Sequence, residues 1–129
     1  MFTLLDETIV EKLKNTLDDG FDLEKAFKVQ NSYVLFLTEN TPHEETLTIL
    51  RLDSTYSELE KIELYAAYMP GIFSVTDVSE NSIAFTFWSK QPMRLCFMAS
   101  KQYRWQFKGV SNVSYLGGFF KSRQLIVKV

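Results

Sequence analysis

Carboxylates gather in two short segments near the start of the chain, where their chemistry suits the binding of a basic protein. The seven residues concerned are Asp18, Asp19, Asp22, Glu24, Glu39, Glu44 and Glu45. Carboxylates on turns can steer a positively charged protein toward a binding face, although a solvated surface carries such residues by default. We expect these seven side chains to contact a partner protein that is basic in charge.

The two signs of charge are separated along the sequence. All 16 acidic residues fall at or before Glu80, whereas the eight charged residues that follow are all basic. The part up to Glu80 carries a formal net charge of −10 once its six basic residues are counted, and the remainder carries +8. Such segregation either cancels within the fold or leaves one lobe facing a partner of opposite sign.

The basic part offers an alternative site, for an anion or a nucleic acid. Its candidate residues are Arg104, Lys108, Lys121 and Arg123. Within residues 101–108 three aromatic residues alternate with polar and basic ones, which predicts a strand with rings on one face and cations on the other. A single-stranded nucleic acid needs rings and cations on the same accessible face. This geometry, with an overall net charge of −2, argues against a nucleic-acid partner.

The residues that usually form catalytic and metal centres are sparse. His43 is the one histidine, and it follows a proline in a polar segment, so we expect no metal site. The sequence has no Gly-x-Ser-x-Gly, no glycine-rich phosphate loop and no Cys-x-x-Cys pair. We therefore expect no cofactor, and we favour a protein that is not an enzyme.

Two functions remain for the acidic and aromatic residues. The first is a non-enzymatic protein-binding module, such as an immunity-protein or antitoxin-like inhibitor that occludes a basic partner; this is an analogy of class. Its interface anchors would come from exposed aromatic residues, with Tyr56, Tyr65, Tyr68 and Trp88 as candidates. The alternative is a small-ligand pocket, with or without catalysis, between a curved sheet and its helices.

Composition indicates a cytoplasmic protein with one domain over residues 1–129. Hydrophobic residues make up 46% of the chain, which is enough for one core without disulfides, and the single Cys96 lies in an apolar run. The apolar stretch Met1–Leu5 has no basic residue before it and is followed by acidic residues, unlike a secretory signal. No apolar run approaches the length of about 18 residues that a membrane span requires, so we expect no membrane partner.

Helical periodicity predicts the elements that would hold these residues. Leu5, Ile9, Leu13 and Leu17 recur at every fourth position, which predicts an amphipathic helix within residues 3–17 that Thr3 or Asp6 would cap. Residues 22–27 predict a further helical turn. Residues 57–69 predict a second helix, because Ser57 and Glu60 have capping-box spacing and Pro70-Gly71 would end it. A strand over residues 61–68 competes with that helix.

The remaining segments predict strands. Residues 33–38 and 46–52 favour a hairpin, whose first strand is apolar on both faces and would be covered on both sides. Residues 72–78 and 82–88 favour a second hairpin, and residues 94–99, 103–110 and 124–129 complete the set. The expected class is therefore α+β, with an antiparallel sheet of about five to seven strands against which the N-terminal helix and one further helix pack.

Overall fold

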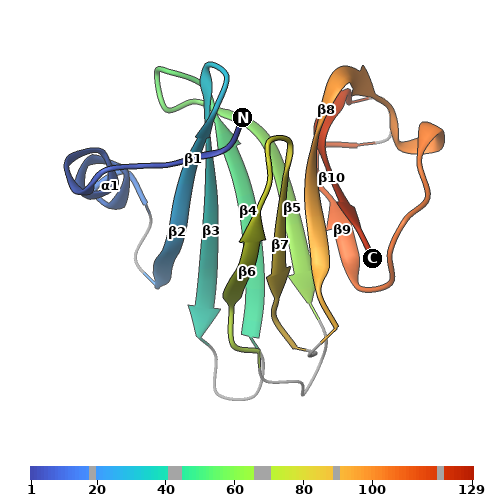
Figure 1. Ribbon diagram of the computed structural model, residues 1–129, viewed down its shortest axis with the longest axis horizontal. Coiled ribbons are helices and arrows are strands. Elements are labelled where there is room, and N and C mark those ends of the chain that lie inside the picture. The colour runs from blue at the N-terminus through green and yellow to red at the C-terminus, as the bar shows by residue number, and fades with distance from the viewer. Residues whose placement is uncertain (18–19, 41–44, 66–70, 89–90, 119–120) are drawn as a thin grey trace.

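Two antiparallel sheets packed face to face make up most of the protein (Figure 1). The computed structural model describes residues 1–17, 20–40, 45–65, 71–88, 91–118 and 121–129. The first sheet has six strands, in the spatial order β1 (Thr3–Leu4), β2 (Phe21–Val29), β3 (Ser32–Asn40), β4 (Glu45–Leu52), β5 (Glu58–Tyr65) and β9 (Val113–Tyr115). The second has four, in the order β10 (Arg123–Lys128), β8 (Met93–Gln102), β7 (Ser82–Thr86) and β6 (Ser74–Val78).

The expected α+β class is wrong, because strands account for 56% of the residues that the structure describes and helical residues for only 10%. The helical elements among the described residues are one α-helix, α1 (Glu7–Lys14), and a single 3₁₀ turn, η1 (Arg104–Gln106). The architecture is a mostly-β sandwich with a helix on one outer face (Figure 1).

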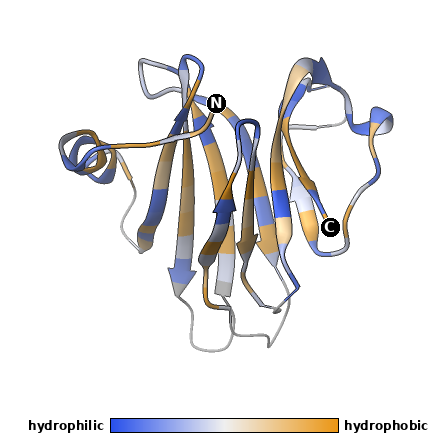
Figure 2. Ribbon diagram, viewed as in Figure 1, coloured by the Kyte–Doolittle hydropathy of each residue, from blue (hydrophilic) through white to orange (hydrophobic). Residues whose placement is uncertain are grey.

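The main core lies between the sheets, where alternate residues of each strand point inward. Val34 and Phe36 of β3 are fully buried, as are Ile83 and Phe85 of β7 and Leu95 of β8. Because successive side chains in a strand point to opposite faces, this alternation gives each sheet one apolar inner face. Figure 2 shows the resulting hydrophobic bands on the strands of both sheets.

A second, smaller core lies between α1 and the outer face of the six-stranded sheet. Leu13 of α1 is fully buried and clusters with Leu35 and Leu37 of β3. The prediction that this strand is covered on both sides is thus confirmed. The N-terminal helix is confirmed too, although it is shorter than expected: Ile9 N–H donates to Asp6 Oδ1 at 3.0 Å, while Thr3 lies in β1.

The second predicted helix is a strand, β5. Ile62 and Leu64 are almost fully buried in the main core, while Lys61 and Glu63, which alternate with them, lie on the outer face. The apolar residues of this segment fit a strand period of two as well as helical spacing. Backbone pairing of seven positions with β4 decides for the strand. The competing strand prediction had the right type of element; its residues 66–68 lie outside the described part of the chain.

The helical turn predicted at residues 22–27 is part of β2. A register shift between Leu23 and Lys25 interrupts the pairing with β3, so Leu23 packs on the helix side and Phe27 in the main core. A bulge of this kind breaks the period of two, which hides a strand from pattern analysis. Both predicted hairpins, by contrast, are present as β3–β4 and β6–β7.

One side of the sandwich is closed by side chains that join the two sheets; we call it the closed side. Glu60 of β5 is 2% exposed, and its Oε1 accepts hydrogen bonds from the backbone amides of Gln124 and Leu125 at 3.0 and 3.1 Å. The other oxygen, Oε2, accepts a bond from Arg51 Nε. Tyr115 of β9 adds a further link, because its hydroxyl accepts a bond from the Val127 amide at 2.8 Å.

Replacing Tyr115 by phenylalanine should destabilise the fold by about 1–3 kcal/mol at neutral pH, because it leaves the buried Val127 amide without its acceptor. Burial raises the pKa of the Tyr115 phenol above its usual 10.0. The neutral phenol is therefore favoured in the folded state, and its stabilisation is present below pH about 10 and lost as the pH rises through the raised pKa. Urea unfolding across this pH range should show a shallower alkaline decline for Tyr115→Phe; equal slopes would contradict the assignment.

Candidate functional site

The side of the sandwich opposite Glu60 is open; we call it the open side. The two-residue strand β1 pairs only with Phe27 and Lys28 of β2, so among the described residues no strand borders β2 over residues 22–25. On the other sheet, β6 is the last strand. The N-terminal segment bridges one end of this side, where Phe2 N–H donates to the Glu80 carbonyl at 3.1 Å. Two strand edges thus face each other across a gap between the sheets.

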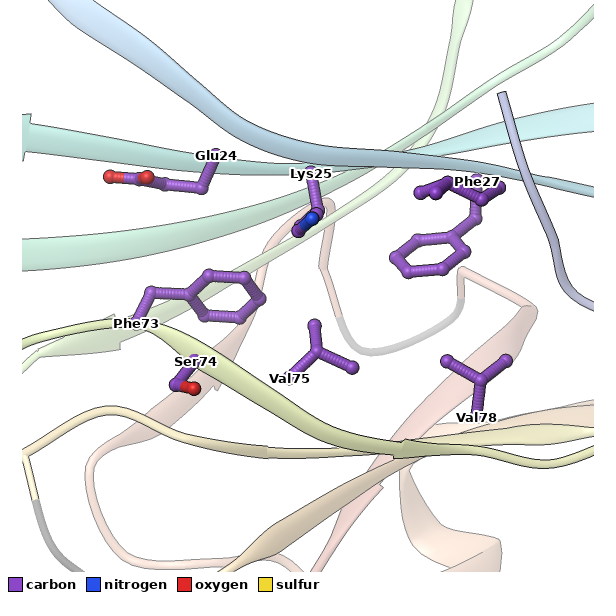
Figure 3. A pocket seen from close by; sticks show the side chains of 8 residues that line it. Glu24, Lys25, Phe27, Phe73, Ser74, Val75 and Val78 are labelled. Carbon is purple, nitrogen blue, oxygen red and sulfur yellow. The ribbon is translucent and has the colours of Figure 1, made fainter. Parts of the chain in front are cut away.

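A hollow of about 590 Å³ lies at this gap; we call it the inter-sheet pocket (Figure 3). One wall comes from β1 and β2 and the other from residues 73–78. Its lining consists of Leu4, Glu24, Lys25, Phe27, Phe73, Ser74, Val75 and Val78. Leu4 and Val78 are 60% and 43% exposed, so the pocket presents apolar surface to solvent. Exposed apolar surface rimmed by polar groups is typical of an interaction site.

Charged residues of β2 stand at the mouth of this pocket because of the bulge. Asp22 is opposite Thr38, and Lys25 is opposite Phe36, so both lie on the face of β2 that looks toward the other sheet. Between them, Glu24 Oε1 accepts a hydrogen bond from the buried Thr38 hydroxyl at 2.9 Å. The pocket therefore combines an apolar interior with one carboxylate held in place and a neighbouring ammonium group (Figure 3).

The predicted acidic residues do not share one face. Asp22 and Glu24 are exposed at the open side, whereas Glu39 is opposite Phe21 on the face that carries α1. Glu45 begins β4. The other three, Asp18, Asp19 and Glu44, lie outside the described residues. Of the four predicted residues that the structure describes, Glu24 lines the inter-sheet pocket, and Asp22 lies two positions before it on β2.

Both arginines among the predicted anion-binding residues bond to the protein itself. Arg123 is 2% exposed, and its guanidinium donates to the carbonyls of Tyr115, Leu116, Gly118 and Lys121. Arg104 Nη1 donates to the Phe107 carbonyl at 3.1 Å. Burial, as the largest influence, lowers the pKa of the Arg123 guanidinium from its usual value. Of the four predicted cations, Lys108 lines a hollow of about 720 Å³ on the four-stranded sheet.

The strand predicted at residues 103–110 is wrong. Residues 104–106 form η1, and the rings of Tyr103 and Trp105 stack on each other with centroids 4.8 Å apart. The guanidinium of Arg104 folds back over the rings of Phe107 and Tyr115, at 5.1 and 5.9 Å from their centroids. These ring and cation–π contacts hold the segment in place without a neighbouring strand. The alternation of aromatic and polar residues here therefore does not mark a strand.

The aromatic residues proposed as anchors have different surroundings. Tyr56 stacks on Tyr33 beside the smaller core under α1, and Trp88 packs against Phe87 and the main core. Tyr65 is 42% exposed, and Tyr68 lies outside the described residues. The structure points instead to smaller apolar residues of the open side, which the sequence analysis did not single out. The alternation within residues 73–78 was the one signal that could have found them.

Among the described residues, neither a group of candidate metal ligands nor a candidate membrane-spanning helix is found. No three His, Cys, Asp or Glu side chains among those residues come together as candidate metal ligands. None of the described helices has the length and apolar character to cross a membrane. The sequence matches no family model, and comparison with curated proteins and with solved structures finds no similar chain.

Proposed function

We propose that this protein is a non-enzymatic protein-binding module, and that its open side receives an extended segment of a basic partner protein. The observation that carries the proposal is the apolar inter-sheet pocket between two strand edges, β2 and β6. An extended peptide can add to such an edge through main-chain hydrogen bonds while its alternate side chains enter a pocket. Burying one partner side chain the size of leucine there would contribute about 1.5–3 kcal/mol.

The charge of the open side supports a basic partner. Exposed carboxylates on β2 and on the β6–β7 hairpin outnumber the exposed lysines there; they are Asp22, Glu24, Asp77 and Glu80, against Lys25 and Lys28. Charges at the rim of an interface chiefly raise the association rate and select the partner's sign. Occlusion of a basic protein, as immunity proteins and antitoxins achieve, is the activity that we infer from this arrangement.

The test begins with cross-linking and purification from the native source, followed by calorimetry with the purified partner. Reversing two rim charges, in the double variant Asp22→Lys and Asp77→Lys, should weaken binding about tenfold or more, mostly through slower association. The matched control is Glu39→Lys with Glu58→Lys, because both side chains are exposed elsewhere on the six-stranded sheet. The control should bind like the unmodified protein.

Hydrogen exchange supplies an independent readout. Partner binding should protect backbone amides of β2 and β6, because an added strand would pair with those edges. Recovery of no stoichiometric partner, recovery of an acidic partner, or protection confined to other strands would each overturn the proposal. The variant Val78→Glu adds a check on the pocket, since it places a carboxylate at an exposed lining position.

A further inference from the structure

A second hollow, of about 720 Å³, lies on the outer face of the four-stranded sheet; we call it the outer groove. Met98 of β8 and Ile126 of β10 form its floor, because their neighbours Phe97, Leu125 and Val127 point into the main core. Its other wall is the segment from Gln106 to Ser111, part of the orange chain that stands off from the sheet between β8 and β9 (Figure 1). The outer groove is thus separate from the inter-sheet pocket.

The wall of the outer groove is anchored to the body of the protein. Arg104 makes the main attachment, through the Phe107 carbonyl and through the rings of Phe107 and Tyr115. Gly109 lies so close to this side chain that an added Cβ would collide with Arg104 Nη2. Tyr103 N–H also donates to Gln106 Oε1 at 2.8 Å. A wall held in this way is preformed, so a ligand would not have to order it.

The lining of the outer groove is amphipathic. Its apolar residues are Met98, Phe107, Val110, Ile126 and Val129. Its long polar side chains are Gln102, Gln106, Lys108 and Lys128, and both lysines are exposed. Pockets for small molecules have this composition, in which an apolar surface provides binding energy and a few polar groups fix the orientation.

The charge of the groove selects the sign of its ligand. Its described lining contains no Asp or Glu side chain, and the sequence has none after Glu80. Within the described parts of the chain, the two ion pairs involve other residues, so Lys108 and Lys128 are not engaged in one. Two ammonium groups without acidic neighbours create a positive potential at the rim of an apolar surface.

From these observations we infer that the outer groove binds an anionic amphiphile, a molecule with an apolar body and one carboxylate or phosphate-ester head. The apolar body would lie on the half-buried Met98 and Val110, above the buried Ile126, and the head would lie between Lys108 and Lys128. A chain on the order of ten carbons fits within a hollow of this size. The inference concerns a different face from the proposed partner site, so either one can fail without the other.

Calorimetric titration of the intact protein with four ten-carbon probes tests the inference, each probe below its micelle concentration. Decanoate and decyl phosphate carry the two anionic heads, decanol is uncharged, and decyltrimethylammonium is a cation. We expect one saturable site for an anionic probe, with decanol weaker by about tenfold because it lacks the charge–charge attraction. A preference between decanoate and decyl phosphate would assign the head group. Binding of decanol or the cation as tightly as both anions, or no saturable binding, would overturn the inference.

Variants identify the groove as the site. Lys108→Gln and Lys128→Gln should each weaken anion binding about three- to fivefold, as expected for partly exposed charge pairs. The control variants Lys12→Gln and Lys14→Gln remove the same charge from α1 and should bind normally. Met98→Glu should weaken binding at least about tenfold by placing a carboxylate on the half-buried floor, with thermal unfolding as the check on folding. Unchanged binding in the double lysine variant would overturn the inference.

Discussion

Replacing Glu60 by alanine should lower the free energy of unfolding by about 3–5 kcal/mol, which makes it one of the two most damaging single changes that we predict. The carboxylate is buried on the closed side, where it accepts two backbone amides of β10 and the Arg51 guanidinium. Its removal would leave all of these donors without an acceptor, and Arg51 has only 12% of its side chain exposed to water. The penalty is that of an uncompensated buried charge.

Graded substitutions separate the charge of Glu60 from its hydrogen bonds. Glu60→Gln keeps one acceptor oxygen for the amides of Gln124 and Leu125 but removes the partner of Arg51, so we expect a loss between those of alanine and the unmodified protein. Glu58→Ala is the matched control, because this glutamate lies on the same strand and is exposed. Urea unfolding measures all three variants. Equal stability of Glu60→Ala and Glu58→Ala would show that the inter-sheet contact is not energetically important.

Replacing Arg123 by methionine should cost about 3–4 kcal/mol, since hydrogen bonds that involve a charged group each contribute about 1.5–3 kcal/mol and some of the freed carbonyls would regain water. The guanidinium donates hydrogen bonds to carbonyls of β9 and of the turn after it, and it lies 5.5 Å from the centre of the Tyr115 ring. Gly117 and Gly118 have φ angles of 103° and 93°, a conformation that glycine adopts most readily. This turn brings the Gly118 carbonyl back to the arginine.

The stability provided by Arg123 should depend on the planar shape of its guanidinium group as well as on its charge. Arg123→Lys keeps the charge but cannot reach the same four carbonyls with one ammonium group, so we expect it to recover less than half of the lost stability. Arg94→Met provides the control, because Arg94 is exposed on β8 and bonds to the Ser82 hydroxyl. Full stability in Arg123→Lys, or a loss as large in Arg94→Met, would contradict the assigned role.

These two residues explain why the sandwich differs between its sides. Glu60 joins β5 to β10, and Arg123 joins β10 to β9 and to the turn after β9. The closed side is therefore held by polar contacts that also satisfy backbone groups. On the open side, the described chain has one such backbone bridge, from Phe2 to Glu80, and an apolar pocket. The variants proposed for partner binding therefore lie away from the contacts that stabilise the closed side.

Local sequence patterns predicted the elements that each bury one face or stripe. The fourfold spacing of Leu5, Ile9 and Leu13 predicted α1, and the double-faced apolar run of β3 predicted its burial on both sides. Both hairpins followed from apolar segments that flank polar turns. These features depend on neighbours a few residues apart, which the sequence displays directly.

The candidate sites could not be derived in the same way. Phe27 and Val78 line one pocket although they are 51 positions apart, and Met98 and Ile126 form one floor through the pairing of β8 with β10. The bulge in β2 also decides that Asp22 and Lys25 face the same side. The charge imbalance was visible in the sequence, but which carboxylates would share a surface was not.

The sequence by itself determined one amphipathic helix, two hairpins and a strong asymmetry of charge, because each is a property of residues that are close along the chain. Tertiary structure alone decided that residues 58–65 form a strand and that Glu60 bonds to β10. It also decided that residues 104–106 form a turn, with Arg104 bonded to the Phe107 carbonyl, where a strand was predicted. The reason is physical: backbone pairing across a sheet and the burial of a charge depend on partners tens of residues away.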